Sequence, residues 1–149
     1  MSQSTTYDPS SIVASFAGVP LSGFADGTFV SVERSNDSFT LMVGAGGEAA
    51  RSRSRNSSGK VTFTLMGTGV VNDLLSAVWR ADELSATGVG SFILKDLNGT
   101  TLCAANNAWI VKPPKIEFGK EISTREWVIE CESVYMKAGG TSSVAVDSF

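Results

Sequence analysis

The alternation of apolar and polar residues in short runs constrains this chain more than any other feature. In KVTFTLMG, residues 60–67, every second side chain is large and apolar, namely Val61, Phe63 and Leu65. Successive side chains of a strand point to opposite faces of a sheet, so this spacing predicts one buried face and one wet face. The chain must therefore build at least one sheet that covers a core.

Runs of the same kind recur through most of the 149 residues. The further strands predicted are IVASF (12–16), TFVSVER (28–34), SFTLMVG (38–44), SFILKDL (91–97), TTLCA (100–104), NAWIVKP (107–113), KIEFGKEIS (115–123) and TREWVIECESVYMK (124–137). The turn SND is expected to join 28–34 and 38–44 in a hairpin. Asn98-Gly99 predicts another hairpin through a type I′ turn, in which both central residues have positive φ.

One segment, residues 67–88, has helical spacing instead. Its apolar residues form one stripe: Val70, Val71, Leu74, Leu75, Val78 and Trp79. Thr68 or Asn72 is expected to cap the start of the helix, and Gly88 lies beyond its end. A lone helix among strands normally covers the open side of a sheet.

These elements predict a mainly β fold, an antiparallel β-sandwich or barrel with one flanking α-helix. Residues 1–149 are expected to form a single domain of seven to nine strands. A polar N-terminal arm is expected at 1–10 and a small-residue C-terminal tail at 138–149.

Residues 45–59, AGGEAARSRSRNSSG, have almost no large apolar side chain and are expected to form a long loop. They interrupt a meander or lie at the tip of an extended hairpin. If the loop is extended, Arg51, Arg53 and Arg55 fall on one edge. Such a ribbon is either a solvated loop or a contact element for carboxylates or phosphates, because the guanidinium fork pairs with both.

The strand REWVIECES, 125–133, has two unlike faces. Trp127, Ile129 and Cys131 share one face, and Glu126, Glu130 and Glu132 share the other with Val128. Three acids on one sheet face repel each other unless water or a cation screens them. This face is either an ordinary wet surface or the wall of a channel that keeps a polyanion away.

Several kinds of chemistry lack the residues that they need. The chain has no His, and its two cysteines, Cys103 and Cys131, form no CxxC pair. We therefore expect no enzyme, no metal site and no cofactor. Two reduced thiols are expected, although neighbouring strands would allow a disulfide. The net charge of −3 disfavours a free nucleic-acid binder. The start MSQSTTYDPS has no signal-peptide pattern and no apolar run spans a membrane, so we expect a chain of cytoplasmic origin without membrane insertion.

The order of these pieces resembles that of phage tail tube proteins, from about Ile12 to Lys137. In the first half, a strand ending in FTLMVGAGGE leads into the arginine-containing loop, then an alternating strand and the helix NDLLSAVW. In the second half, the carriers are SFILKDLNGTTLCAANNAWIV and the later REWVIECE. The likeness lies in layout and includes no catalytic fingerprint.

The resemblance implies a structural subunit of the virion tail. Six subunits of such a protein close into a ring whose inner sheets form one barrel around a lumen. Stacked rings make a hollow tube that conducts DNA, holds the tape-measure protein, and contacts a sheath and a baseplate; the type VI secretion tube protein is related. On this view Arg51, Arg53 and Arg55 contact a neighbouring subunit, ring or sheath, or else the DNA. Glu126, Glu130 and Glu132 are the candidate lumen face.

Other functions fit the same pattern of elements. A tail terminator, a head-completion protein or the tube subunit of a tail-like injection system is the nearest alternative. A monomeric β-sandwich binding module, such as a carbohydrate binder, is a second one. It would need exposed aromatic residues on one sheet face, whereas Trp79 and Trp127 are expected in the core.

Overall fold

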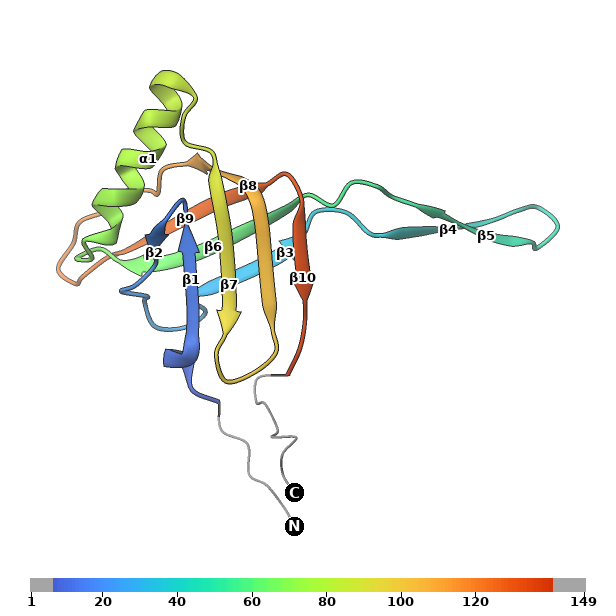
Figure 1. The fold of residues 1–149 in the computed structure, drawn as a ribbon, viewed down its shortest axis with the longest axis horizontal. Coiled ribbons are helices and arrows are strands. Elements are labelled where there is room, and N and C mark those ends of the chain that lie inside the picture. Colours follow the sequence, from blue (N-terminus) through green and yellow to red (C-terminus); the bar gives the residue numbers. More distant parts are fainter. Residues whose placement is uncertain (1–6, 141–149) are drawn as a thin grey trace, which may run out of the picture.

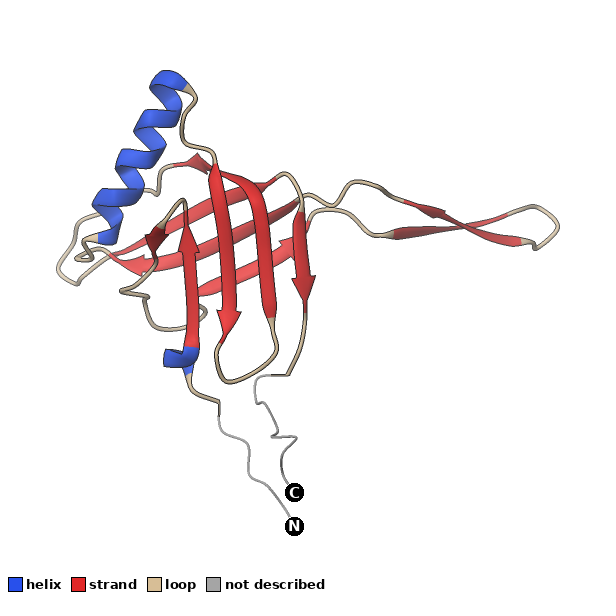
Figure 2. Cartoon of the chain, in the orientation of Figure 1, coloured by secondary structure: helices blue, strands red, loops and turns tan. Residues whose placement is uncertain are grey.

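The computed structural model describes residues 7–140, which form two packed β layers, one helix and a hairpin that projects from the body (Figure 1). The chain order is a 3-10 turn at Pro9–Ser11, β1 (Ile12–Phe16), β2 (Val19–Pro20), β3 (Val30–Arg34), β4 (Phe39–Val43), β5 (Ala49–Arg53), β6 (Gly59–Met66), α1 (Val71–Ser85), β7 (Gly90–Asp96), β8 (Leu102–Lys112), β9 (Thr124–Cys131) and β10 (Val134–Lys137). The predicted mainly β, sandwich-like fold with one helix is confirmed (Figure 2).

The main sheet has the strand order β2-β1-β7-β8-β9-β6-β3, with β10 also paired to β8, and all its pairs are antiparallel. The first half of β8 pairs with β7 and β10, and its second half pairs with β9. In Figure 1, β1, β7 and β10 run across the direction of β3, β6 and β9. One continuous sheet thus folds over at β8 into two layers, and within the described residues its path does not close into a barrel.

The bend in β8 corrects one prediction, because TTLCA and NAWIVKP belong to a single strand. The two predicted segments left Ala105 and Asn106 between them. Asn106 and Asn107 are exposed at the corner where β8 passes from one layer to the other. The pairing of β8 with β7 shifts register across this corner, between Ala105 and Ala108, and its pairing with β9 shifts between Ile110 and Lys112. These irregularities let the strand turn without ending.

The core lies between the two layers. The alternation in β6 is confirmed, since Val61, Phe63 and Leu65 are fully buried. Trp127 and Ile129 of β9 face the same interior and are equally buried. Together with Phe16 and Phe92 from the other layer, they belong to one continuous cluster. Burying such side chains is the main stabilising contribution to a fold of this kind.

Helix α1 flanks the sandwich and contacts β2 and β8. Only part of its predicted stripe is buried: Leu75 and Val71 enter the core, and Val78 and Trp79 pack against it. Val70 and Leu74 stay exposed. The helix is therefore seated along one narrow line and leaves part of its apolar surface uncovered.

The predicted N-cap of α1 is wrong, whereas Gly88 lies beyond the end of the helix as expected. Val70 occupies the N-cap position and makes no side-chain hydrogen bond there. The Asn72 amide donates to the carbonyls of Met66 and Gly69 and does not accept from a helix N–H group. The left-handed residue that ends the helix is Ala86, with φ 54°, and not glycine. The Gly88 N–H instead donates to the Asp82 carboxylate, 3.2 Å away.

The β7–β8 hairpin was predicted correctly, but its turn type was not. Neither Asn98 nor Gly99 has a positive φ among the described residues. Instead, the connection is longer than a two-residue turn, and the Asp96 N–H donates to the Thr101 carbonyl. The Asp96 carboxylate accepts the Asn98 N–H at 3.0 Å, so a side chain holds the chain reversal.

The last part of the chain also differs from the prediction. KIEFGKEIS is not a strand but part of the β8–β9 connection, in which Ile116, Phe118 and Ile122 are exposed. TREWVIECESVYMK is two strands, because the chain turns after Cys131 so that β10 pairs with β8.

The two thiols are both free and buried. Burial raises the pKa of Cys103. Burial, with a smaller contribution from the Glu130 charge, raises the pKa of Cys131 to about 11. Of the predicted terminal arms, residues 1–6 and 141–149 lie outside the described residues. Pro9–Ser11 form a turn that Asp8 caps through the Ser10 N–H.

Candidate functional site

The β4–β5 hairpin is the most distinctive surface of the molecule and corrects two predictions. Residues 28–34 and 38–44 do not pair with each other: β3 pairs with β6, and β4 pairs with β5. The segment predicted as a long loop, 45–59, contains β5. Hydrogen bonds from Ser35 to Ser58 and from Ser54 to Ser38 link the two ladders. Residues 35–58, called the arm below, therefore extend the β3–β6 hairpin away from the body (Figure 1).

Every residue of β4 and β5 is exposed. The register places Phe39 opposite Arg53, Leu41 opposite Arg51 and Val43 opposite Ala49, so these side chains share one face. We call them the apolar–arginine face. The Arg51 guanidinium carbon lies 4.1 Å from the centre of the Phe39 ring, in a cation–π contact between diagonal neighbours. This face thus presents three large apolar side chains and two cations to solvent.

The three arginines predicted as a contact element all lie on the arm. Arg51 and Arg53 are in β5 and share one face, as the period of two requires, whereas Arg55 follows the end of the strand. All three side chains are exposed. The apolar partners on β4 were missed, although Phe39, Leu41 and Val43 show the same period of two, because this run was assigned to a hairpin with residues 28–34.

The three glutamates lie at the outer surface of the layer that contains β9. Trp127, Ile129 and Cys131 are fully buried, so the predicted division of faces is confirmed. Glu126 and Glu130 lie opposite Thr64 and Lys60 of β6. Glu132 follows β9, where its backbone N–H donates to the Asn107 carbonyl at 3.0 Å.

The acidic face is less uniform than the sequence of β9 suggests. Lys60 lies between Glu130 on one side and Glu33 of β3 on the other. Trp109 of β8 lies on the far side of Glu130. A cation between two carboxylates reduces their mutual repulsion. The sequence of β9 alone cannot predict that Lys60 lies beside Glu130, because the order of strands in a sheet is set by the tertiary fold.

Residues 7–140 contain no group of three or more His, Cys, Asp or Glu side chains that could hold a metal ion. No helix in this part of the chain is both long and apolar enough to cross a membrane. The distinctive surfaces are therefore the arm and the outer face of the β6–β9 layer.

Comparison with solved structures supports the fold. The chain superposes on the anti-feeding prophage cap, a tube-terminating cap, with a TM-score of 0.61, 9% identity and coverage of 92% of this chain and 94% of that one. It matches a chain of the PVC sheath–tube complex of an extracellular contractile injection system with a TM-score of 0.60, 14% identity and coverage of 89% and 91%. The PVC sheath/tube terminator matches with a TM-score of 0.60 and 13% identity, over 92% of this chain and 100% of that one.

Sequence comparison identifies the family. The chain is 32% identical over 151 residues to the structural protein ORF10 of Pseudomonas phage KPP10, covering 96% of this chain and 87% of that protein. The family model described as bacteriophage PhiTE tail tube protein matches residues 6–139, nearly the whole chain. The expected resemblance is confirmed, and the chain belongs to the PhiTE tail tube protein family of phage structural proteins.

Proposed function

We propose that six copies of this chain close into a ring and that the rings stack into the hollow tube of a phage tail. The tube conducts DNA and holds the tape-measure protein. It is surrounded by a sheath and ends at a baseplate, and the subunit has no catalytic role. Membership of the tail tube family supports this proposal, as does the similarity of the fold to a chain of a sheath–tube complex.

The observation that carries the proposal is the exposed arm. A two-stranded hairpin is at best marginally stable alone in water, and within residues 7–140 no third strand pairs with this one and no helix packs across it. Phe39, Leu41, Met42 and Val43 are 45%, 68%, 65% and 62% exposed. Apolar side chains gathered on a projection mark a surface that another protein covers. A repeated subunit supplies that cover in a ring or a stack.

The arginines are proposed to pair with acidic groups of an adjacent subunit, ring or sheath protein. Contact with DNA in the lumen is less favourable for function, because several arginine–phosphate contacts would hold DNA that has to pass. Glu126, Glu130 and Glu132 are proposed to line the lumen for the same reason, since carboxylates repel phosphates.

Negative-stain electron microscopy of the purified, untagged protein across a concentration series tests the assembly. We expect rings or tubes with a central hole. A monomer at every concentration would contradict the proposal and favour a binding module. A second candidate function is tail termination, because two of the similar structures are a cap and a terminator. Long filaments indicate a tube subunit, whereas single rings that do not stack indicate a terminator.

Replacing Arg51, Arg53 and Arg55 together by Ala tests the contact role of the arm. All three are exposed, so the free energy of unfolding of the subunit should change little. Tube formation should fall, and the wild-type tube should itself weaken with rising salt, which screens such pairs. The matched control replaces Lys112, Lys115 and Lys120, which lie elsewhere on the surface, by Ala. Unchanged polymerisation of the arginine variant would exclude the contact role.

A further inference from the structure

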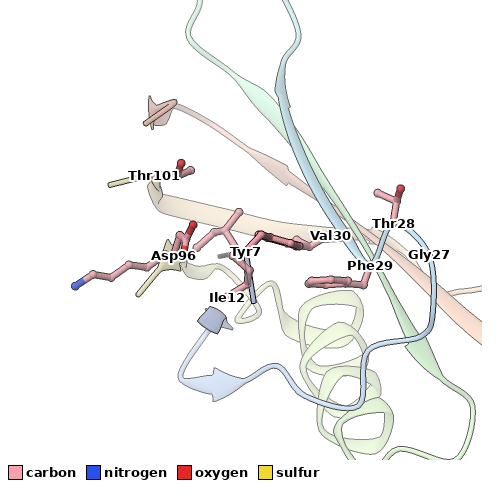
Figure 3. A pocket seen from close by; sticks show the side chains of 10 residues that line it. Tyr7, Ile12, Gly27, Thr28, Phe29, Val30, Asp96 and Thr101 are labelled. Atoms are coloured by element: carbon pink, nitrogen blue, oxygen red, sulfur yellow. The ribbon is translucent and has the colours of Figure 1, made fainter. Parts of the chain in front are cut away.

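A cavity of about 390 Å³ lies at one end of the sandwich, between the β1–β7 layer and the segment that leads into β3. Most of its wall is apolar or aromatic, and its lining includes Tyr7, Ile12, Phe29, Val30, Asp96 and Thr101. Figure 3 shows the Asp96 carboxylate beside Ile12 and Tyr7, with the Phe29 ring on the other side. Asp96 supplies the one carboxylate of this recess, whose other polar lining residues are Thr28, Lys95 and Thr101.

Asp96 is 4% exposed, and among the described residues it is the one charged side chain that is buried. Its Oδ1 atom accepts the Asn98 N–H at 3.0 Å, and its backbone is fixed by bonds to Thr101 and Gly99. Its Oδ2 atom is buried and has no hydrogen-bond partner among the described residues. The carboxylate is thus rigidly held, with one oxygen unsatisfied in the recess.

An uncompensated buried carboxylate is strongly unfavourable, and buried charges in proteins are normally paired. The neighbouring Lys95 does not pair with it among the described residues. Lys95 lies opposite Val13, which is 40% exposed, so its side chain is on the outer face of the sheet. Asp96 lies opposite Ile12 on the inner face. Among the described residues, Asp96 Oδ2 therefore has no donor from either face of the sheet.

The walls of the recess favour a guanidinium over an ammonium group. A guanidinium is planar and weakly hydrated, and it stacks on aromatic rings such as those of Tyr7 and Phe29. It also carries enough donors to reach a second acceptor. The Thr101 hydroxyl donates to the Gly139 carbonyl at 2.8 Å, which leaves its oxygen free to accept.

The chain carries its own exposed guanidinium groups on the arm. The arm points away from its own body, so it does not bring them to its own Asp96 (Figure 1). We infer that the recess beside Asp96 is the acceptor site for an arginine of the arm, Arg51, Arg53 or Arg55, from a second copy of this chain. This inference rests on the proposed tube assembly. In this arrangement the Asp96 carboxylate of one copy pairs with a guanidinium group on the arm of another.

Cross-linking between two single-cysteine variants tests where the arm lies. Ser52→Cys on the arm and Thr28→Cys at the rim of the recess are mixed under polymerising conditions and treated with a short bismaleimide. A covalent heterodimer on a denaturing gel is expected. Cys103 and Cys131 react little, because burial keeps both thiols inaccessible and raises their pKa. The control pairs Ser52→Cys with Glu83→Cys on α1, which should give no heterodimer.

Asp96→Asn tests the charge itself. Asparagine keeps the Oδ1 acceptor for Asn98, so the dispersed subunit should melt at the wild-type temperature or above. The critical concentration for polymerisation should rise by about tenfold or more, because truncating a buried interfacial charge pair weakens association by that order. The control Asp26→Asn makes the same change at an exposed carboxylate and should polymerise like the wild type.

Two kinds of failure are distinguishable. Tubes that form normally from Asp96→Asn, or wild-type-like tubes whose arm and rim do not cross-link, overturn the acceptor site and leave the tube proposal standing. A wild-type protein that forms no rings or tubes at any concentration overturns the tube proposal and the acceptor site with it.

Discussion

Asn72 shows how one side chain can join separate parts of the fold. Its Nδ2 atom donates to the carbonyls of Met66 and Gly69, at 2.9 and 3.0 Å. Its Oδ1 atom accepts the indole N–H of Trp127 at 3.0 Å. The residue therefore fastens the start of α1 to the end of β6 and to the largest fully buried side chain of the core.

Asn72→Ala should lower the free energy of unfolding by about 2–3 kcal/mol, because it leaves the buried indole N–H without a partner. Denaturant unfolding of the dispersed subunit measures the change. Asn106→Ala, at the exposed corner of β8, is the control and should change little. An Asn72→Ala subunit as stable as the wild type would show that these bonds contribute nothing net.

Cys131 gives a pH dependence with a definite sign. Its thiol has a pKa of about 11 in the folded protein, against an ordinary value of 9.0. Between these values the unfolded chain has lost the thiol proton and the folded chain has not. The contribution of this thiol to the free energy of unfolding is therefore complete below pH 9 and is lost as the pH rises toward 11.

The expected loss is about 1–2 kcal/mol between pH 8 and pH 11. Urea unfolding at both pH values measures it. Other groups also titrate in this range, so the comparison is with Cys131→Ala, whose loss should be smaller by that amount. Equal pH dependence in the two proteins would contradict the raised pKa.

At the scale of elements, the root of the arm depends on Gly59. A Cβ atom there would lie 2.5 Å from Cγ1 of Val134 and 2.7 Å from the Glu33 carbonyl oxygen. The position has no room because β3, β6 and β10 meet there.

Gly59→Ala should destabilise the subunit by about 1–3 kcal/mol through overpacking, as measured by thermal or denaturant unfolding. Gly119→Ala is the matched control, since a Cβ there meets nothing within 4 Å. It should be neutral or slightly stabilising. A neutral Gly59→Ala would mean that β10 moves aside easily.

The arm itself should contribute to assembly and not to the stability of the subunit. Leu41 is 68% exposed, so Leu41→Ser should leave the melting temperature of the dispersed subunit unchanged. Polymerisation should weaken by about 1–2 kcal/mol per interface, the value of one buried leucine side chain. Sedimentation of polymer against free subunit measures this, with the exposed Leu97→Ser outside the arm as control. Unchanged sedimentation would show that no partner covers this face.

Local pattern was enough to predict most elements and not enough to predict how they pair. The period of two located β1, β6 and β9, and the period of 3.6 located α1. These periods could not show that β3 pairs with β6, the strand that follows the arm. The tripeptide SND looks like a complete turn, whereas the chain reverses direction at Gly44–Glu48. The sequence pattern could not reveal the recess beside Asp96 either, because the recess forms only where the two layers meet.

For the molecule as a whole, the proposed lumen face makes a prediction about passage. Glu126→Lys should leave the subunit folded and able to polymerise, because Glu126 is an exposed residue opposite Thr64. Tubes of this variant should retain added double-stranded DNA at low salt and release it as salt rises. Wild-type tubes should retain little.

Co-sedimentation of labelled DNA with preformed tubes measures retention. The control is Glu117→Lys in the exposed β8–β9 connection, which makes the same change of charge elsewhere. Equal retention by both variants would mean that Glu126 lies on the outside of the tube.

The arm leaves the body on one side only, and its chemistry is unlike that of the surfaces around Asp96. A contact between two such unlike surfaces is not self-complementary, so it does not stop at a pair of subunits. If the arm joins stacked rings through the proposed acceptor site, the tube has a direction, with free arms at one end and free acceptor surfaces at the other. The two ends would then grow at different rates, and a single protein that occupies one kind of end would be enough to fix the length.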